Sequence, residues 1–443
     1  MKKFLFILLV LLMVVPAYGL QTPDVEVGGH VRLRGYNFQN FWDFDSSKDG
    51  DNWSVFRLRS NIHVKADLGD NVTGFIQFAN QNYGEGTTYA SKLDKWEADN
   101  TSDKVFVDNA YIDVNKFFGL PVSLRLGRQN LMYGTGFVLF DGQSQMASTS
   151  LYFDGVKLTW KITDRSKLDL FYVKDQENER GNNNNDDITL SGAYFTGHCP
   201  VIGGQQELYV LNRDDQGFVS AAGGTGKNIW MYGIRLSNKF DCGVDYSAEF
   251  AYQNGYYDKG NNIHQDAAGY KLETGYAVPV SDTFKPRVFI GYTYLSGDES
   301  DSTDNEAWDV FYGGWPQFGD LLAWVYVNLG PGNPTTGRPL QYNRMSSTLG
   351  EAAYTNLCMP SIGINAKYGK LSGKISYTKL TFDETTGSQD DDFGDYYQIQ
   401  ARYQYSKHLS FAGYAAMIDP GDAFNSFHAN SAYEAFWETR IDF

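Results

Sequence analysis

The sequence predicts an all-β fold, a transmembrane antiparallel β-barrel of about eighteen strands with short periplasmic turns and long extracellular loops. Three observations predict it. Apolar and polar residues alternate with a period of two in many runs, whereas almost no segment keeps helical periodicity. The links between these runs alternate between short and long. The chain also begins like an exported protein and ends on an alternating run that closes with an aromatic residue.

The N-terminus is typical of a secretory signal peptide. Two lysines precede an apolar run over residues 4–15, and the small residues Ala17 and Gly19 suit a cleavage site. The apolar run is shorter than the roughly 20 residues that cross a bilayer comfortably, which disfavours a membrane anchor. We therefore expect a signal peptide at residues 1–19 and a mature barrel at residues 20–443.

The composition narrows the classes of partner and chemistry. The formal charge is −16, and it becomes −18 without Lys2 and Lys3, which argues against nucleic acid. The three cysteines, Cys199, Cys242 and Cys358, are too far apart in sequence to predict a zinc site or a catalytic pair. Because no serine elbow, HExxH motif or paired metal-ligand motif is present, we expect no cofactor, no bound metal and no enzyme.

Period-two alternation is clearest in "FRLRSNIHVKA", residues 56–66. Phe56, Leu58 and Ile62 fall on one face of this strand, and Arg57 and Arg59 on the other. Similar runs predict the complete set of strands at residues 25–37, 54–66, 71–81, 105–115, 121–129, 153–162, 167–174, 188–196, 205–212, 228–237, 243–253, 266–278, 285–296, 358–368, 371–381, 395–405, 408–418 and 432–443.

The lengths of the connections distinguish a membrane barrel from a soluble sheet. Short links such as "DLGDN" and "SKH" take every second place, and long polar links fall between them, the longest over residues 296–357. This sorting places short turns at one rim and long loops at the other, with the N-terminus in the periplasm. Because an open edge is not tolerated in lipid, the last strand is expected to pair with the first. The run "LLAWVYVN", residues 321–328, breaks the alternation if counted as a strand, and we assign it to a loop that folds back.

The last strand shows what each face of the wall is expected to contact. Trp437, Ile441 and Phe443 share one face and Glu434 and Glu438 the other, so the apolar face is assigned to lipid and the acidic face to the lumen. A strand that ends on phenylalanine resembles the C-terminal signature read by the barrel-assembly machinery. The expected partners are this machinery, outer-membrane lipid and lipopolysaccharide, with the protein itself a monomer.

The first two predicted strands carry basic residues at the alternate positions that are expected to face the lumen. These residues are Arg32, Arg34, Arg57 and Arg59. Charges in a narrow, low-dielectric throat concentrate counter-ions, and the planar guanidinium fork binds carboxylates in a bidentate manner. This wall is therefore expected to favour anions. Further cations of inward parity are His30, His63, Lys65, Arg125, Lys157, Lys161, Lys271, Arg287, Lys367, Lys374 and Arg402.

A second interpretation of these arginines is structural. Acidic residues of inward parity also occur, at Asp169, Glu207, Asp245, Glu249, Glu273, Glu434 and Glu438. Because closure brings the last strand beside the first, Glu434 or Glu438 can pair with Arg32 or Arg34 and stiffen the wall. Both interpretations stay open at this point, and each can hold for different arginines.

One stretch of the chain resembles a known family. "LRLGRQNLMYGTGFVLFDG" is followed by a strand that opens on Phe-Asp-Gly. It resembles the alginate export family of outer-membrane channels in a Leu-Gly-Arg-Gln motif, a Tyr-Gly pair and this Phe-Asp-Gly, which here are Leu126, Gly127, Arg128, Gln129, Tyr133, Gly134, Phe153, Asp154 and Gly155. "FYGGWPQFGDLLAWVY" is similar to an aromatic Gly-x-Trp-Pro loop segment of bacterial relatives.

The resemblance implies a pore with an arginine-lined constriction that passes an acidic polysaccharide or related anion without covalent chemistry, and with loops able to plug it. Arg125 and Arg128 carry over from the motif, although alternation turns Arg128 toward lipid, so we expect a bulge or the strand's end there. The candidate selectivity residues are Arg32, Arg34, Arg57, Arg59, Arg125 and Arg128. A lumen of mixed sign disfavours alginate itself. The alternatives are a general nutrient porin without uronate selectivity and a plugged, surface-binding barrel.

Overall fold

The computed structural model describes residues 23–41, 44, 46, 52–83, 105–141, 150–176, 187–198, 203–219, 223, 225–281, 283–313, 321–323, 325, 355–385, 390–424 and 430–443. The signal peptide expected at residues 1–19 lies outside these ranges. None of the helices found within them has the length and apolar character needed to cross a membrane.

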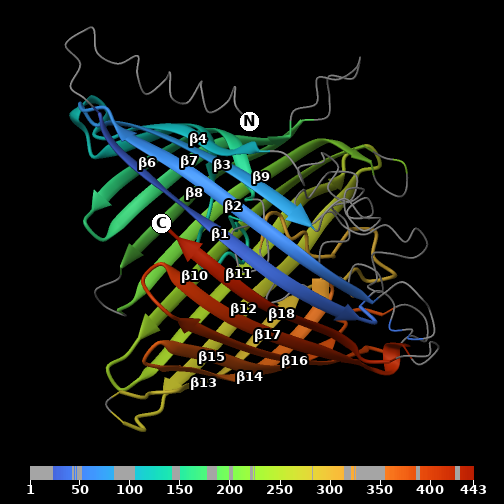
Figure 1. Cartoon of the computed structure of the whole chain (residues 1–443). Helices are drawn as coiled ribbons and strands as arrows, with labels where there is room; N and C mark the ends of the chain where they lie inside the picture. Colours follow the sequence, from blue (N-terminus) through green and yellow to red (C-terminus); the bar gives the residue numbers. More distant parts are fainter. Residues whose placement is uncertain are drawn as a thin grey trace.

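Eighteen antiparallel strands form one closed sheet, in which each strand pairs with its neighbours in sequence and β18 pairs with β1 (Figure 1). Every strand predicted from the sequence overlaps one of them, so the predicted barrel is confirmed. The strands are β1 Asp24–Gln39, β2 Trp53–Asp67, β3 Val72–Tyr83, β4 Phe106–Val114, β5 Val122–Asn130, β6 Tyr152–Thr163, β7 Ser166–Gln176, β8 Ile188–His198, β9 Gln205–Val219, β10 Thr225–Lys239, β11 Val244–Asp258, β12 Ile263–Ala277, β13 Arg287–Leu295, β14 Leu357–Tyr368, β15 Leu371–Thr381, β16 Asp392–Gln404, β17 Leu409–Pro420 and β18 Ala432–Asp442.

The seam between the first and last strands is fully hydrogen-bonded at its periplasmic end. The Phe443 amide donates to the Gly29 carbonyl at 3.0 Å, and the Gly29 amide donates to the Phe443 carbonyl at 2.9 Å. Farther along, the register sets Arg34 opposite Glu438. Closure therefore removes the free edge that lipid does not tolerate, as the sequence analysis expected.

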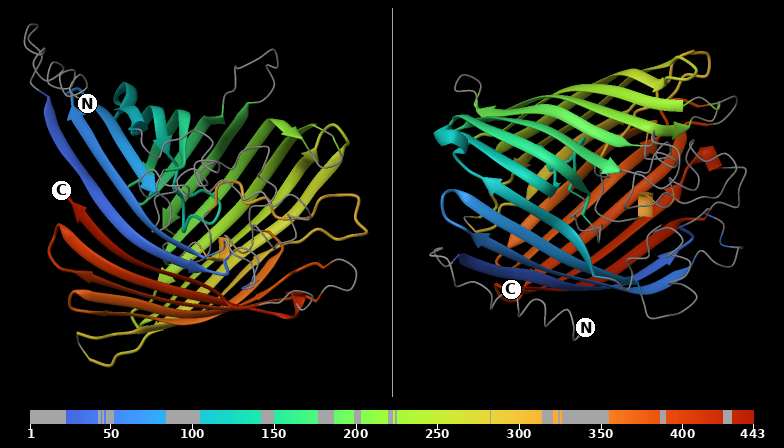
Figure 2. Two further views of the ribbon diagram at one scale, coloured as in Figure 1. Left: turned by 45° about the vertical axis from the view of Figure 1, so that its right-hand side comes forward. Right: turned by 90° about the horizontal axis from the view of Figure 1, so that it is seen from above.

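The alternation separates an apolar outer face from a polar inner face. Phe56, Ile62 and Trp437 point outward and are exposed by 59%, 50% and 46%. Exposure of so many large apolar side chains is unfavourable in water and favourable in lipid. The strands cross the barrel obliquely (Figure 2), as closure of a sheet into a barrel requires.

The turns at the periplasmic rim are tight. Between β2 and β3 the chain reverses through Gly69, Asp70 and Asn71, all of which have positive φ angles, of 78°, 49° and 65°. Glycine, aspartate and asparagine are the residues that adopt this left-handed region most readily. The short polar links of the sequence therefore correspond to real turns.

Two long connections fold into the barrel and form what we call the inner loop cluster, residues 131–141 between β5 and β6 and residues 308–313 between β13 and β14. Phe137 stacks on Trp308 with ring centroids 5.5 Å apart, and Leu139 forms a parallel bridge with Tyr312. The cluster packs on the inner wall, where Tyr133 stacks on Tyr194 at 4.1 Å. The buried apolar cluster of the described residues therefore includes side chains inside the barrel, away from lipid.

The run "LLAWVYVN" is not a strand in its described part. Leu321, Leu322, Ala323 and Val325 are helical and buried, while Trp324 and residues 326–328 lie outside the described residues. The Leu321 amide donates to Glu434 Oε2 on the inner face of β18 at 2.9 Å. The assignment to a loop that folds back is correct for these four residues.

Candidate functional site

The first two strands hold four buried arginines on the inner wall. The β1–β2 register sets Arg32 opposite Arg59 and Arg34 opposite Arg57. All four are buried, with exposed fractions of 1% to 4%. Like charges directly opposite each other destabilise a sheet, so this arrangement needs compensating groups nearby. We call these four residues the arginine cluster.

Closure brings one compensating carboxylate, Glu438 on β18, to this cluster. Its Oε2 accepts from Arg34 Nε at 2.7 Å and lies 4.0 Å from Arg32 Nε. Its Oε1 accepts from Arg402 Nη2 on β16 at 2.9 Å. Arg34 also donates to the Tyr36 hydroxyl at 2.7 Å and lies 4.5 Å above the Phe436 ring. Of the pairings left open between Glu434 or Glu438 and Arg32 or Arg34, the structure contains the ion pair of Glu438 with Arg34.

Arg125 lies on the inner face of β5, away from β1 and β2. Its Nε and Nη2 donate to the two oxygens of Asp113 at 2.7 Å and 2.8 Å, and its guanidinium lies 3.8 Å from the centre of the Tyr111 ring. The register places it opposite Lys157 on β6. Arg125 thus faces the lumen as predicted, but its charge is matched by a bidentate carboxylate.

Arg128 lies on the outer face, with the same parity as the exposed Leu126. The expected bulge is wrong, because the registers of β5 with β4 and β6 run through Arg128 without a shift. Its guanidinium binds both oxygens of Asp154 at 2.9 Å and 2.8 Å and lies 4.2 Å from the Tyr152 ring. Arg128 lies two residues before the end of β5, and its ion pair with Asp154 joins β5 to β6 on the outside of the wall.

The other motif residues have packing roles that the structure makes plain. Gly127 has a φ of 122°, and a Cβ there would approach the Ala110 carbonyl oxygen to 2.3 Å, so only glycine fits. Phe153 is 1% exposed and meets the Tyr312 ring edge-on at 4.9 Å. Much of the motif therefore shapes the wall and holds the inner loop cluster.

Asp309 anchors the inner loop cluster to the wall. Its carboxylate lies 3.2 Å from Arg213 Nη1 on β9 and 3.1 Å from Lys227 Nζ on β10, and its side chain is 7% exposed. The Asp309 amide donates to Gln253 Oε1 on β11 at 2.9 Å. Arg213 and Lys227 are not among the residues predicted to point inward, because each lies one residue outside the strand predicted for it.

Several inward acids pair with cations on neighbouring strands. Arg235 lies 2.9 Å from Glu207, and Arg287 lies 2.5 Å from Asp245 and 2.9 Å from Glu273. The inner wall is therefore mixed in sign, as expected. Within the described residues no group of three or more histidine, cysteine, aspartate or glutamate side chains is placed to hold a metal ion.

Comparison with known protein families and solved structures identifies relatives of this barrel. The family model described as alginate export matches residues 24–437. The chain belongs to the alginate export family. No curated protein sequence matches it.

Solved structures share the fold of this alginate export family member at low sequence identity. Acinetobacter baumannii OccAB4 is 10% identical with a TM-score of 0.56, over 96% of this chain and 99% of that one. Pseudomonas aeruginosa OccK9 (OpdG) is 13% identical with a TM-score of 0.55, over 95% and 99%. A BenF-like porin from Pseudomonas fluorescens Pf-5 is 11% identical with a TM-score of 0.54, over 95% and 98%.

Family and fold together define the class of this protein. It is a porin or channel of the bacterial outer membrane. Lipid surrounds its outer face, and small solutes pass through the lumen that its polar inner face lines. Barrels of this family and fold are channels rather than enzymes.

The Asp309 anchor predicts a pH dependence of conductance. Burial would raise the pKa of Asp309, but Lys227 and Arg213 outweigh it and lower the pKa from 3.8 to about 2. A depressed pKa means that the anchor contributes fully above the ordinary carboxyl value and is lost as the pH falls through the folded value. We expect single-channel conductance to be constant down to about pH 4 and to rise between about pH 4 and pH 2.

The control for this titration is Asp309→Asn, which cannot ionise. Asp215 is a second carboxylate, 3.3 Å from Arg213, so the comparison between the wild type and the variant isolates the contribution of Asp309. A rise of equal size in both proteins would contradict the assignment to Asp309.

Proposed function

We propose that this channel prefers anions and passes solutes that carry carboxylates, uronate-containing oligo- or polysaccharides among them. The observation that carries the proposal is the arginine cluster, four guanidinium groups on two adjacent strands of the inner wall. A concentration of one charge in a confined, low-dielectric channel raises the local concentration of the opposite ion. Membership of the alginate export family supports a carboxylate-bearing solute.

The proposal differs from the sequence prediction in its residues. The selectivity residues are Arg32, Arg34, Arg57 and Arg59, together with Arg125, which also faces the lumen and binds Asp113. Arg128 is left out because it lies on the outer face. We also propose a signal peptide at residues 1–19, one barrel domain at residues 20–443, Phe443 as part of the signal for barrel assembly, and a monomeric state.

The test is the reversal potential across a planar bilayer under a salt gradient. We expect anion preference in the wild type and a shift toward cations in Arg57→Ala/Arg59→Ala, because two fixed charges are removed from the lumen. The matched control is Lys116→Ala/Arg165→Ala, which removes two exposed charges from periplasmic turns, where salt screens them. Cation preference in the wild type, or no shift in the Arg57/Arg59 variant, would remove the proposal.

A plugged, surface-binding barrel is the second candidate, and one observation favours it. The connection between β13 and β14 contacts opposite parts of the wall, with Asp309 bound to β9 and β10 and Leu321 bound to β18. Retained ligand binding without measurable conductance would support this candidate. Large conductance that uronate oligomers do not alter would instead indicate a general nutrient porin.

A further inference from the structure

A row of charged residues crosses β5, β6 and β7 on the outer face of the wall. The register sets Arg128 opposite Asp154, and Asp154 opposite Lys174. We call these three residues the outer charged row. On each strand the outward residue two positions nearer the periplasm is an exposed apolar or aromatic residue, namely Leu126, Val156 and Tyr172. The row therefore directly borders the surface that contacts lipid.

The outer charged row lies below the outer edge of the apolar band. Arg128 is six residues from the periplasmic start of β5 at Val122. A rise of about 3.3 Å per residue and a tilt of about 35–45° place it roughly 15 Å above that start. The apolar band of an outer-membrane barrel is about 25 Å tall. On β2 the outward Phe56 is eleven residues from the periplasmic end at Asp67 and is still an exposed aromatic residue.

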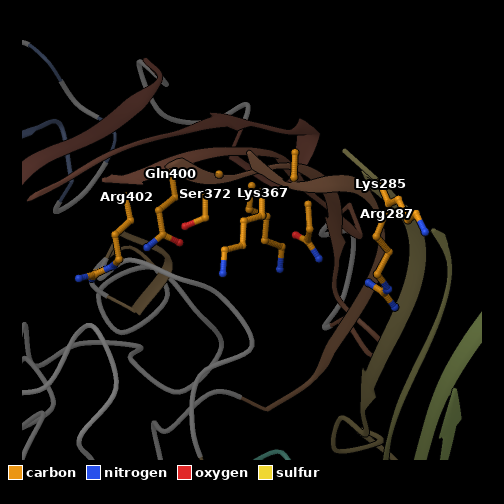
Figure 3. Close-up of a pocket in the computed structure, with 10 residues that line it drawn as sticks. Lys285, Arg287, Lys367, Ser372, Gln400 and Arg402 are labelled. Carbon is orange, nitrogen blue, oxygen red and sulfur yellow. The ribbon is translucent and has the colours of Figure 1, made fainter. Parts of the chain in front are cut away.

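Charged groups at this depth need polar partners that acyl chains do not supply. On the inner wall, Lys367 and Arg402 point into the lumen, where water reaches them (Figure 3). Arg128 faces lipid instead. Its Nε and Nη2 donate to Asp154 and its Nη1 to the Val107 carbonyl, which uses three of the five guanidinium N–H groups. Two N–H groups remain, and the Asp154 side chain is 56% exposed.

We propose that the outer charged row binds lipid A, the phosphorylated disaccharide that anchors lipopolysaccharide in the outer leaflet. Phosphate oxygens suit the remaining N–H groups of Arg128 and the ammonium of Lys174, and sugar hydroxyls suit the exposed Asp154 carboxylate. Arg128 and Lys174 are two strand spacings apart, roughly 10 Å. A disaccharide with a phosphate at each end can bridge this separation.

The ion pairs within the row determine how such a ligand is held. Lys174 pairs with Asp187 at 2.9 Å and Arg128 with Asp154 at 2.8 Å, so the phosphates would share these cations with carboxylates. Attraction between net charges alone therefore does not select the ligand. A head group that offers both acceptors and hydroxyl donors matches a row that contains both signs of charge.

The same register row continues toward the outer surface with groups that suit further sugars. It runs from Lys174 to Thr189, Asp214 and Asn228 on β8, β9 and β10. Asn228 Nδ2 donates to Asp214 Oδ1 at 2.9 Å. Asn228 is eleven residues from the periplasmic end of β10, whereas Arg128 is six from that of β5, so the row rises through the membrane. This direction fits a glycolipid whose saccharide extends outward from its phosphates.

The test is binding of lipid A to the delipidated full-length barrel in detergent, titrated by native mass spectrometry. We expect Arg128→Leu/Asp154→Leu to weaken binding roughly tenfold, because several charge-assisted contacts are lost together. Removal of both partners leaves neither charge unpaired in lipid, so the wall should stay folded. Heat-modifiable gel mobility checks this. Should the leucine variant not fold, Arg128→Gln/Asp154→Gln is measured instead and should also weaken binding.

The matched control is Arg125→Leu/Asp113→Leu. It removes a bidentate ion pair of the same kind from the inner face of β5 and β4, three residues along the chain from Arg128. Lipid A affinity should stay within about twofold of the wild type, because the inner face does not contact lipid. Equal losses in the two variants would show a general effect on the wall and would overturn the proposal.

Two further lipids identify the chemistry of the ligand. Phosphatidylglycerol has one phosphate and no sugar ring, so it should bind roughly fivefold more weakly than lipid A. Dephosphorylated lipid A should also bind weakly, because it offers no acceptor of full charge to Arg128 and Lys174. Equal affinity for lipid A and either of these lipids, or unchanged lipid A affinity in the variants at Arg128 and Asp154, would overturn the proposal. The site lies on the outer face, so these outcomes do not depend on which solute the lumen passes.

Discussion

Replacement of Asp309 by alanine is expected to release the inner loop cluster from the wall and to raise single-channel conductance severalfold. The Asp309 carboxylate is the shared partner of Arg213 and Lys227, at 3.2 Å and 3.1 Å, and both cations are buried. Removal of one partner of a buried ion pair leaves uncompensated charge and costs about 3–5 kcal/mol. Arg213 keeps its ion pair with Asp215 at 3.3 Å, but movement of the loop away from the wall admits water that hydrates both cations.

This expectation is measured by conductance in planar bilayers and by limited proteolysis of the loop between β13 and β14. Both should increase in Asp309→Ala. The matched control is Asp301→Ala, an exposed acid in the same connection, whose loss changes the charge equally without touching the wall. Unchanged conductance together with unchanged proteolysis in Asp309→Ala would show that the aromatic contacts alone hold the loop.

The fold is predictable because the membrane imposes two constraints on every strand. Lipid outside and water inside force the alternation seen in Phe56 to Ala66, and the absence of tolerated edges forces closure. These constraints also predict that an acid of the last strand lies beside an arginine of the first, and Arg34 and Glu438 form such a pair although they are 404 positions apart in the chain. Where a physical constraint acts on each residue, local sequence is sufficient to infer a distant contact.

Those constraints weaken where strands leave the lipid. There both faces contact polar surroundings, so the alternation fades, and Arg213 and Lys227 fall just outside their predicted strands while β9 and β10 continue past them. Inner-loop contacts carry no periodic signal at all, since Asp309 and Arg213 are 96 positions apart and belong to elements of different kinds. Arg128 is the opposite case. Plain alternation correctly predicts that it lies on the outer face, whereas the expected bulge is what allowed it to be included among the selectivity residues.

The two interpretations of the arginine cluster, wall reinforcement and solute passage, are separated by Glu438→Gln. Glu438 is 3% exposed and accepts charge-assisted hydrogen bonds from Arg34 and Arg402. A neutral glutamine leaves the buried Arg34 and the partly exposed Arg402 without this counter-charge, so we expect the free energy of unfolding to fall by about 3–5 kcal/mol, most of it from Arg34. The lumen also gains one net positive charge, so the reversal potential should move further toward anions.

Equilibrium unfolding in lipid vesicles and reversal potentials measured on the same variant give the two answers independently. The matched control is Glu26→Gln, since Glu26 pairs with Lys65 at 3.6 Å in an exposed position, where an ion pair is worth about 0–1 kcal/mol. Lower stability with unchanged selectivity would assign the arginine cluster to wall reinforcement alone. A larger anion preference with little loss of stability would assign it to passage. Both changes together would mean that the buried Glu438 carboxylate both stabilises the contact between β1 and β18 and limits the positive charge of the lumen.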